Sequence, residues 1–523
     1  MRMNHHEGHE GGHHTGHVEA GHALTLETAH EDEGVYIKLL LGEKLVRVET
    51  PDIKTVEDFI PPLQALQRLT RVESEKDIGA RGPSIAAITT NENVGNRALE
   101  LFMVPFGRDS LDTARDLEDI YPQLLRSTVL FHAEKQGVTN APRREEEPGR
   151  AFHEYKEVDR SELAKKLEED PTAWDWPFYG EVDATPKYIS SIHEVFLKEG
   201  QSFLSERYKG RDGEEHSIEH SLDAAVGWLC RRLDQNPEGL LEFKAAFKGS
   251  IENQVWKDSG DSYMHKDGTN ANHDQGIASI EVQGLAYDAL VDAADMYQEL
   301  GKTEESERLR ERALRLKEFV LEKFWVEDER GGYFALGTDR DERGALRTLE
   351  VRASNMGHLL SSKILDGDEP ELQRKRDAVV ETLFSPEMLA ASGVRTLSNK
   401  EVKFRPGAYH NGTVWFGDNS IIRRGLKRHG YTAQAEDLAD RMLAVVEKYK
   451  KYPEFARGGD EEEPLLNSHI IDIQSADGRP NRVEQPPQEI QAWTVAAIIA
   501  ILHERRLPLT TDFSKPAQKM ALH

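Results

Sequence analysis

Residues 282–320 read VQGLAYDALVDAADMYQELGKTEESERLRERALRLKEFV, and apolar side chains recur there every three or four positions. The first apolar stripe consists of Val282, Leu285, Ala286, Ala289, Ala293 and Met296. Gly301 ends it, and Thr303 stands where a helix N-cap is expected. The second stripe consists of Leu309, Ala313, Leu316 and Val320. This spacing predicts two consecutive, antiparallel helices.

The helical pattern continues through most of the chain. Helices are predicted at about 416–429, ended by Gly430, and at 433–449, and one β-hairpin is predicted near 331–334. Such a succession fits an α-solenoid, a helical bundle or a closed α/α barrel. Because no repeat of fixed period is present, we expect an all-α toroid whose chemistry lies on its loops.

Four segments are expected along the chain. Residues 1–30 hold eight of the 21 histidines, among Gly and Glu and without an apolar period, so a disordered tail is predicted. Residues 31–85 are predicted to form a lead-in of extended segments with a short helix near 63–69. The helical domain is expected to span 86–507, and a C-terminal tail spans 508–523.

Composition excludes several classes of function. The net charge of -27 would repel a phosphate backbone, so nucleic acid is not expected as a partner. The single cysteine, Cys230, rules out a disulfide framework and a multi-thiolate metal site within one chain, which suits a reducing cytoplasm. The longest apolar run, Val495 to Leu502, is too short to cross a bilayer. A cytoplasmic protein without a membrane partner is therefore expected.

The loops between the predicted helices are rich in Trp, Tyr, Asp, Glu and Arg. Aromatic faces stack on sugar rings, and carboxylates and Arg bind adjacent hydroxyls. Residues 174–186 combine several aromatic and acidic side chains. Asp258 lies beside Trp256 and near Asp261, where its pKa can be raised as a general acid requires. The alternative is that such aspartates, and Asp109 or Ser110, are helix caps.

Motifs of other chemistries are missing from the sequence. It contains no GxxxxGK[ST], no GxGxxG and no GxSxG. A pair of carboxyl groups acting on a sugar acetal remains the economical hypothesis. Glycoside hydrolysis of this kind needs neither a cofactor nor a metal.

Eight ordered motifs between about residues 90 and 505 carry a family resemblance. They are FGRDS (106–110), EEEPGRAFHE (145–154), YGEVDATP (179–186), WKDSGDS (256–262), EVQG (281–284), YHNGTVWFGDN (409–419), PEF (453–455) and QAW (491–493). As a set they resemble the C-terminal catalytic domain of glycogen-debranching enzymes and the bacterial amylo-α-1,6-glucosidases, which are glucoamylase-like six-hairpin glycosidases.

The resemblance implies an (α/α)6 toroid and an inverting α-glycoside hydrolase without a metal. It implies that Asp258 is the general acid and Glu454 the general base. Glu484 and Glu489, the nearest acidic residues before Trp493, are the alternatives for the base. Arg108 and Asp109 match a pair that holds the glycone sugar. The other residues expected to bind the carbohydrate substrate are Asp183, Trp256, Asp261, His410, Trp415, Asp418 and Trp493.

Alternatives to a debranching activity stay open. The residues before the helical domain are too few for the additional N-terminal domains of the larger debranching enzymes. Related barrels include mannosylglycerate and glucosylglycerate hydrolases and other α-glycosidases. A sugar lyase, phosphorylase or epimerase on the same toroid is a further hypothesis. A non-catalytic toroid that binds carbohydrate is the hypothesis from another class, and the two carboxyls at Asp258 and Glu454 argue against it.

Overall fold

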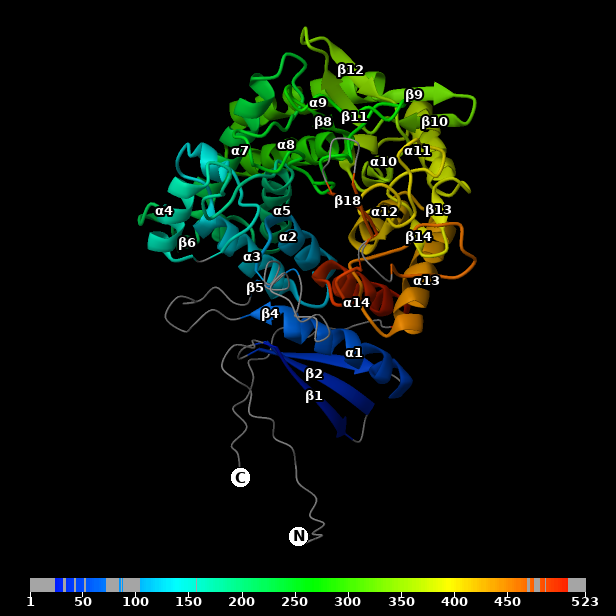
Figure 1. The fold of residues 1–523 in the computed structure, drawn as a ribbon. Helices are drawn as coiled ribbons and strands as arrows, with labels where there is room; N and C mark the ends of the chain where they lie inside the picture. Colours follow the sequence, from blue (N-terminus) through cyan, green and yellow to red (C-terminus); the bar gives the residue numbers. More distant parts are fainter. Residues whose placement is uncertain are drawn as a thin grey trace, which may run out of the picture.

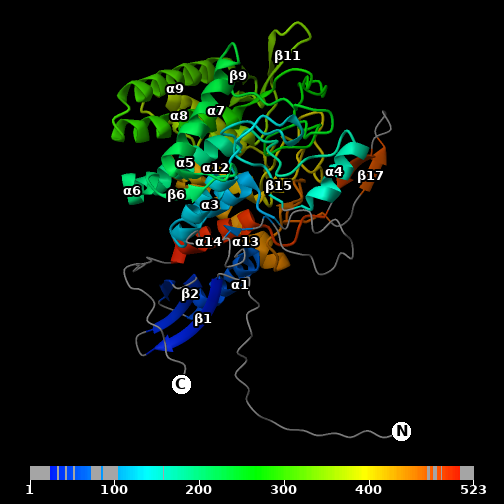
Figure 2. The same cartoon turned by 90° about the vertical axis from the view of Figure 1, so that its left-hand side faces the viewer.

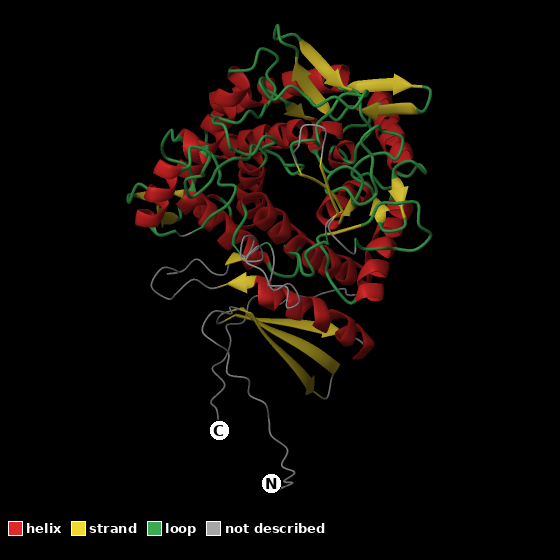
Figure 3. Cartoon of the chain, viewed as in Figure 1, coloured by secondary structure: helices red, strands yellow, loops and turns green. Residues whose placement is uncertain are grey.

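The computed structural model is rich in helices, and its strands are short (Figure 3). The described residues are 24–31, 34–41, 44–50, 53–71, 84–85, 87, 104–156, 158–467, 471–474, 480–484 and 486–506. The helical fold predicted from the sequence is therefore confirmed at the level of its class. Within the described residues, no helix combines the length and the apolar character needed to cross a bilayer.

Six helices pack side by side in a closed ring (Figure 1). They are α2 (Gly107–Asp116), α5 (Ala184–Glu199), α8 (Ile280–Glu299), α10 (Asn355–His358), α12 (Phe416–Arg428) and α14 (Ala492–Arg506). Each contacts the next in this order, and α14 contacts α2. The ring is thus closed by helices from the two ends of the helical region.

A second set of helices packs on the outside of this ring. It consists of α1 (Ile53–Leu69), α3 (Pro122–Lys135), α7 (Ile218–Asp234), α9 (Thr303–Lys323), α11 (Pro370–Leu383) and α13 (Thr432–Tyr449). α9 packs on α8, α13 packs on α12 and α14, and α1 packs on α14. The predicted stripe at Leu309, Ala313, Leu316 and Val320 is buried in this interface, as its period requires. α9 begins at Thr303 itself, so Lys302 and not Thr303 is the N-cap.

Short strands and further helices lie in the connections. The predicted hairpin is formed by β9 (Trp325–Asp328) and β10 (Gly331–Phe334), which pair antiparallel. A three-stranded sheet has the order β12-β11-β8. The bounds of the remaining elements are α4 (Arg160–Glu169), α6 (Gln201–Leu204), β4 (Thr70–Arg71), β5 (Ser84–Ile85), β6 (Arg207–Lys209), β7 (Glu215–Ser217), β8 (Ala278–Ser279), β11 (Gly337–Arg340), β12 (Leu346–Leu349), β13 (Leu389–Ala390), β14 (Gly393–Val394), β15 (Val414–Trp415), β16 (Phe455–Ala456), β17 (Ile471–Gln474) and β18 (Pro480–Glu484).

The N-terminal segment differs from the prediction in two places. An antiparallel sheet of β1 (Leu24–Glu31), β2 (Gly34–Leu41) and β3 (Lys44–Thr50) contacts α1. β1 begins inside the segment 1–30 that was predicted to be a tail. The strand was not predicted because its short alternating run follows a long His/Gly tract. α1 is also longer than the predicted helix near 63–69, since Pro61 and Pro62 obscure its pattern. Residues 1–23 and 508–523 lie outside the described residues.

The helices of the inner ring begin at one end of the molecule. Figure 2 shows α4, β15 and β17 toward that end, and α6, α8 and α9 toward the other. Backbone N–H groups at helix N-termini carry partial positive charge. The first turns of α2, α8 and α12 hold Asp109, Glu281 and Asp418, so acidic side chains gather where that charge favours them.

Candidate active site

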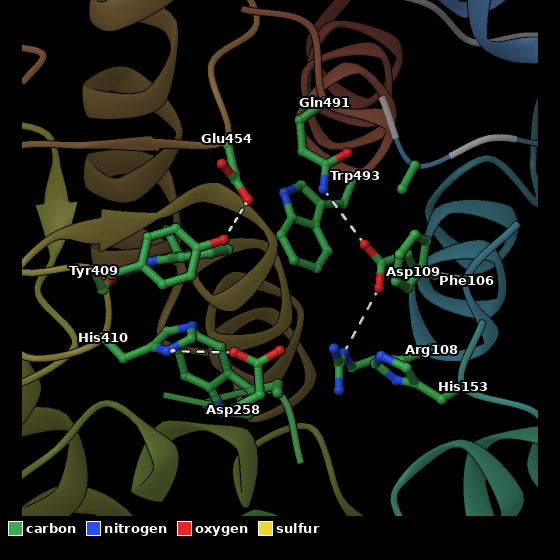
Figure 4. A pocket seen from close by; sticks show the side chains of 13 residues that line it. Phe106, Arg108, Asp109, His153, Asp258, Tyr409, His410, Glu454, Gln491 and Trp493 are labelled. Atoms are coloured by element: carbon green, nitrogen blue, oxygen red, sulfur yellow. Dashed lines mark hydrogen bonds and ion pairs between the residues drawn. The ribbon is translucent and has the colours of Figure 1, made fainter. Parts of the chain in front are cut away.

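One cavity collects most of the predicted site residues (Figure 4). Its lining residues are Ala87, Phe106, Arg108, Asp109, His153, Trp256, Asp258, Tyr409, His410, Trp415, Glu454, Gln491 and Trp493. They come from segments that are far apart in the sequence. Gln491, for example, donates to Asp109 from 382 positions away, over 3.4 Å.

Local structure explains how these side chains reach the cavity. Arg108 and Asp109 lie in the first turn of α2, directly after Gly107. A Cβ at Gly107 would lie 2.0 Å from the carbonyl oxygen of Phe152, so only glycine permits this close approach. Trp415 in β15 pairs with Phe455 in β16, which places Glu454 at the start of that short ladder.

Glu454 is buried and is held in position by hydrogen bonds. The hydroxyl of Tyr409 donates to its Oε1 over 2.8 Å, and the backbone N–H of Gln488 points at its Oε2 over 3.5 Å. Its own backbone N–H donates to the carbonyl of Gln488 over 3.0 Å. Donors directed at a carboxylate stabilise its ionised form.

Asp258 has a different environment. Its carboxylate lies 3.8 Å from Nδ1 of His410, which is too far for a hydrogen bond. The backbone N–H of Ser259 donates to the same Nδ1 over 3.3 Å, so this nitrogen is an acceptor and has no proton for Asp258. Burial holds the pKa of His410 well below its usual range, and the ring is therefore neutral. No other described group hydrogen-bonds to the carboxyl of Asp258, which favours its protonated form.

Burial raises the pKa of both carboxyl groups. The pKa of Glu454 rises to about 7, although the hydrogen bond from Tyr409 opposes the rise. The pKa of Asp258 rises to about 6, because the positive charge of Arg108 offsets part of the desolvation. Asp258 keeps 38% of its side chain exposed, toward the cavity that it lines. Because the two pKa values are close, the hydrogen bonds are a better criterion than the pKa values for telling the acid from the base.

Arg108 lies among three acidic groups beside the cavity. Its guanidinium donates to Asp183 over 3.1 Å and lies 3.4 Å from Glu181 and 3.7 Å from Asp109. Although burial lowers the pKa of Arg108, the charges of these three groups hold it above its usual value. Burial raises the pKa of Asp109 to about 6. The Arg108–Asp109 pair offers a cationic donor and a carboxyl acceptor, a combination that suits adjacent hydroxyls.

Aromatic rings form the wall between the two catalytic candidates. Trp256, Trp415, Phe455 and Trp493 make a cluster of their own, with Tyr409 packed against it. Trp415 contacts Trp493 edge to face with ring centroids 5.6 Å apart, and it contacts Trp256 in the same way at 6.0 Å. Figure 4 shows Glu454 above Asp258, both on the same side of Trp493 in that view. Rings of this kind provide an apolar surface for a sugar.

Two predicted binding residues, Asp183 and Asp418, do not line this cavity. They line a second, smaller cavity that shares Arg108, Trp256, Trp415 and Trp493 with the first. His358 lies 2.6 Å from Oδ1 of Asp418, and its ring stacks on Trp256 at 5.8 Å. Asp183 therefore contacts the cavity residue Arg108, and Asp418 contacts His358, which stacks on the cavity residue Trp256.

Two other predicted residues lie outside the cavity, and a third is not described by its side chain. Asp261 is exposed and lies outside the cavity, because the turn after Asp258 carries it to the surface, where its carbonyl accepts from Lys403 and Asn411. Glu489, one alternative base, pairs with Lys451 and does not line the cavity. The side chain of Glu484, the other alternative, lies outside the described residues.

The helix-cap alternatives also fail. Phe106 is the N-cap of α2, so Asp109 and Ser110 stand inside the helix. Asp258 and Asp261 lie in the long loop between α7 and β8, and no helix begins at either.

Sequence reasoning assigned no role to five lining residues: Ala87, Phe106, His153, Tyr409 and Gln491. All of them except Ala87 stand inside a quoted motif. Their membership of those motifs was the signal available. Which member of a motif faces the cavity depends on the backbone turn, which spacing does not reveal.

The described residues contain no group of three or more His, Cys, Asp or Glu side chains placed to hold a metal ion. The site is therefore described by its carboxyl, guanidinium and aromatic groups.

The family follows from the comparison of sequences. Residues 113–457, most of the chain, match the model of the mannosylglycerate hydrolase MGH1-like glycoside hydrolase domain. The chain belongs to this family and is a glycoside hydrolase of the MGH1-like type. No curated protein sequence matches it.

Solved structures agree at the level of the fold. The chain is similar to the GH63 mannosylglycerate hydrolase from Thermus thermophilus in complex with Tris, with 15% identity and a TM-score of 0.50. The complexes of the same enzyme with Tris and D-glycerate, and with glucose, give 14% identity and TM-scores of 0.51 and 0.50. Each alignment covers 86% of this chain and 100% of the other.

Proposed function

We propose that this chain is an inverting, exo-acting α-glycosidase built on an (α/α)6 toroid. In this proposal Asp258 is the general acid and Glu454 is the general base. The observation that carries it is that these two carboxyls line one aromatic cavity together with the Arg108–Asp109 pair (Figure 4). The toroid is supported by the closed ring of six helices and the outer set packed on it.

The mechanism follows from the hydrogen bonds at the two carboxyls. In the working state Asp258, which receives no hydrogen bond from described groups, carries a proton and gives it to the leaving oxygen. Glu454, which accepts a hydrogen bond from Tyr409, is ionised in that state and takes a proton from water as water attacks the anomeric carbon. A single displacement of this kind inverts the anomeric configuration.

The proposed substrate is a small α-glycoside of glyceric acid, such as mannosylglycerate or glucosylglycerate. The family model and the solved mannosylglycerate hydrolase to which the chain is similar support this choice. The ordered motifs that resemble debranching enzymes support an α-1,6-glucoside as the second candidate. The two candidates differ in the aglycone, which is an acid in one case and a neutral sugar in the other.

The test is a substrate panel in which the glycoside and the presence of inorganic phosphate are varied independently. Mannosylglycerate, glucosylglycerate, isomaltose and a branched α-1,6-oligosaccharide are incubated with the full chain, with and without inorganic phosphate. We expect hydrolysis of at least one glycerate glycoside at a kcat/KM well above that for isomaltose. Faster hydrolysis of the α-1,6-glucosides would assign the debranching-type activity instead. Turnover that requires phosphate would show a phosphorylase and overturn the proposal.

A further inference from the structure

We propose that His153 binds a hydroxyl of the glycone sugar through its Nε2 atom, and that Glu181 is the positioning residue that holds the ring for this contact. The inference rests on the proposed function, because it concerns the sugar on which Asp258 and Glu454 act. His153 lies in the loop between α3 and α4 and lines the catalytic cavity together with Arg108 (Figure 4).

The ring of His153 is fixed on three sides. Its Nδ1 lies 2.9 Å from Oε2 of Glu181. Its faces and edge pack against Phe106 and Phe178, with ring centroids 5.4 Å and 5.9 Å apart and interplanar angles of 90° and 86°. Nδ1 is therefore occupied, and in the described part of the chain no hydrogen bond reaches Nε2. The cavity is the space left for a partner of that atom.

Glu181 joins His153 to the sugar-binding helix terminus. Its side chain is 1% exposed, and it does not line the cavity. The backbone N–H of Arg108 donates to its Oε1 over 3.3 Å, and the guanidinium of Arg108 lies 3.4 Å from its Oε2. Since the same Oε2 contacts His153, one buried carboxyl fixes two cavity residues, one from a loop and one from the first turn of α2. This is the arrangement expected of a group that acts through its neighbours.

The chemistry of the ring suits a hydroxyl. Burial, together with the charge of Arg108, lowers the pKa of His153, so the imidazole is neutral and does not compete with Asp258 as the acid. A neutral imidazole has one donor and one acceptor nitrogen, and a sugar hydroxyl both donates and accepts. The contact therefore forms with either tautomer. The position of the proton between Nδ1 and Glu181 decides only in which direction the hydrogen bond runs.

A deoxy-sugar series tests the contact. The kcat/KM of the best α-glycoside of the panel is compared with those of its 2-, 3-, 4- and 6-deoxy glycone analogues, for the wild type and for His153→Phe. In the wild type we expect removal of the contacted hydroxyl to lower kcat/KM roughly tenfold or more, which is the effect of losing one hydrogen bond in a site without water. In His153→Phe the cost at that one position should fall below about threefold, and the costs at the others should persist.

Four further variants separate binding from folding. His153→Gln keeps a polar group and should restore part of the wild-type cost at the same position. Glu181→Leu should weaken the same hydroxyl dependence, since the ring loses its anchor, while Glu181→Gln should weaken it less. His216→Phe is the matched control, because His216 also contacts a carboxylate, Asp212 at 2.8 Å, but lies outside the cavity. Its deoxy costs should equal those of the wild type.

The outcomes distinguish this inference from the proposed function. If His153→Phe lowers activity on every analogue by the same factor, the histidine has only a structural role and the inference is wrong. If the wild type hydrolyses no glycoside of the panel, the proposed function fails. In that case the same series is measured as calorimetric binding of the free deoxy sugars. The His153 inference then stands or falls on whether one position loses its binding cost in His153→Phe.

Discussion

The hydroxyl of Tyr409 donates a 2.8 Å hydrogen bond to Oε1 of Glu454, and the two residues come from loops 45 positions apart. This bond is the clearest difference between the two catalytic candidates, since no described group donates to Asp258. It opposes the rise that burial imposes on the pKa of Glu454. Tyr409 is therefore the residue through which the base can be tested without removing it.

Activity should depend on pH as a narrow bell. The working state has a proton on Asp258 and none on Glu454, whose pKa values are about 6 and about 7. Below pH about 6 activity falls because Glu454 is increasingly protonated, and above pH about 7 it falls because Asp258 loses its proton. The maximum of kcat/KM should lie near pH 6.5. A broad plateau extending above pH 8 would contradict the two assignments.

Tyr409→Phe should move one limb of that bell. Without the hydroxyl, the ionised form of Glu454 loses a donor and its pKa rises further. The upper limb of the pH profile should then shift to higher pH and the lower limb should stay. The maximum should fall about tenfold for each rise of one in that pKa. An unchanged profile, measured as kcat/KM from pH 5 to 9, would mean that Glu454 is not the base.

Replacement of the two carboxyls should have different effects on an activated substrate. Asp258→Asn should abolish hydrolysis of a natural glycoside but spare much of the turnover of a glycosyl fluoride, because fluoride leaves without a proton. Glu454→Gln should abolish both reactions, since water must still be activated. Fluoride release measured with an ion-selective electrode checks this. A fully active Glu454→Gln variant would refute the assignment of the base.

The product of an α-glycoside should first appear as the β-anomer. A single displacement with water between the base and the sugar inverts the anomeric carbon, and inverting enzymes hold their carboxyls roughly 6.5–9.5 Å apart to admit that water. Proton NMR recorded before mutarotation is the measurement. Initial release of the α-anomer would require a covalent intermediate and a different mechanism.

Asp109→Ala should lower kcat/KM by a hundredfold or more, about 3 kcal/mol of transition-state stabilisation. The melting temperature should change little, because the contacts of Asp109 are long: Gln491 at 3.4 Å and Arg108 at 3.7 Å. Asp112→Ala, one turn along the same helix, is the contrasting variant. It leaves the buried ammonium of Lys187 unpaired after the loss of contacts of 2.7 Å and 2.8 Å, so it should lower the melting temperature strongly. Equal melting temperatures for the two variants would contradict this reasoning.

Local patterns predicted the helices well and the assembly of the site only in part. The apolar stripe from Leu309 to Val320 depends on side chains three or four positions apart, so its helix could be read from the sequence. Asp109 and Gln491, by contrast, are brought together by closure of the helical ring, which no local period encodes. For the same reason the sequence did not reveal that Asp183 and Asp418 line a second cavity beside the one that contains Asp258 and Glu454.

Turn geometry explains the other differences. Asp261 and Asp258 are three positions apart in one acidic loop, and only the path of the backbone sends one to the cavity and the other to solvent. His153 stands in one of the quoted motifs, but its ring is held in place by Glu181, 28 positions away. Such pairings across loops are set by tertiary packing.

The contact between α1 and α14 ties the order of synthesis to the completion of the fold. α1 leaves the ribosome before any helix of the inner ring, and the helix it packs against is the last one of the described chain. Until α14 is made, the part of α1 that packs on α14 has no permanent partner there. The loop that contains Glu454, and Trp493 in α14, are also synthesised late. A nascent chain stalled before α14 should therefore bind chaperones and lack hydrolytic activity, although most of its helices are already made.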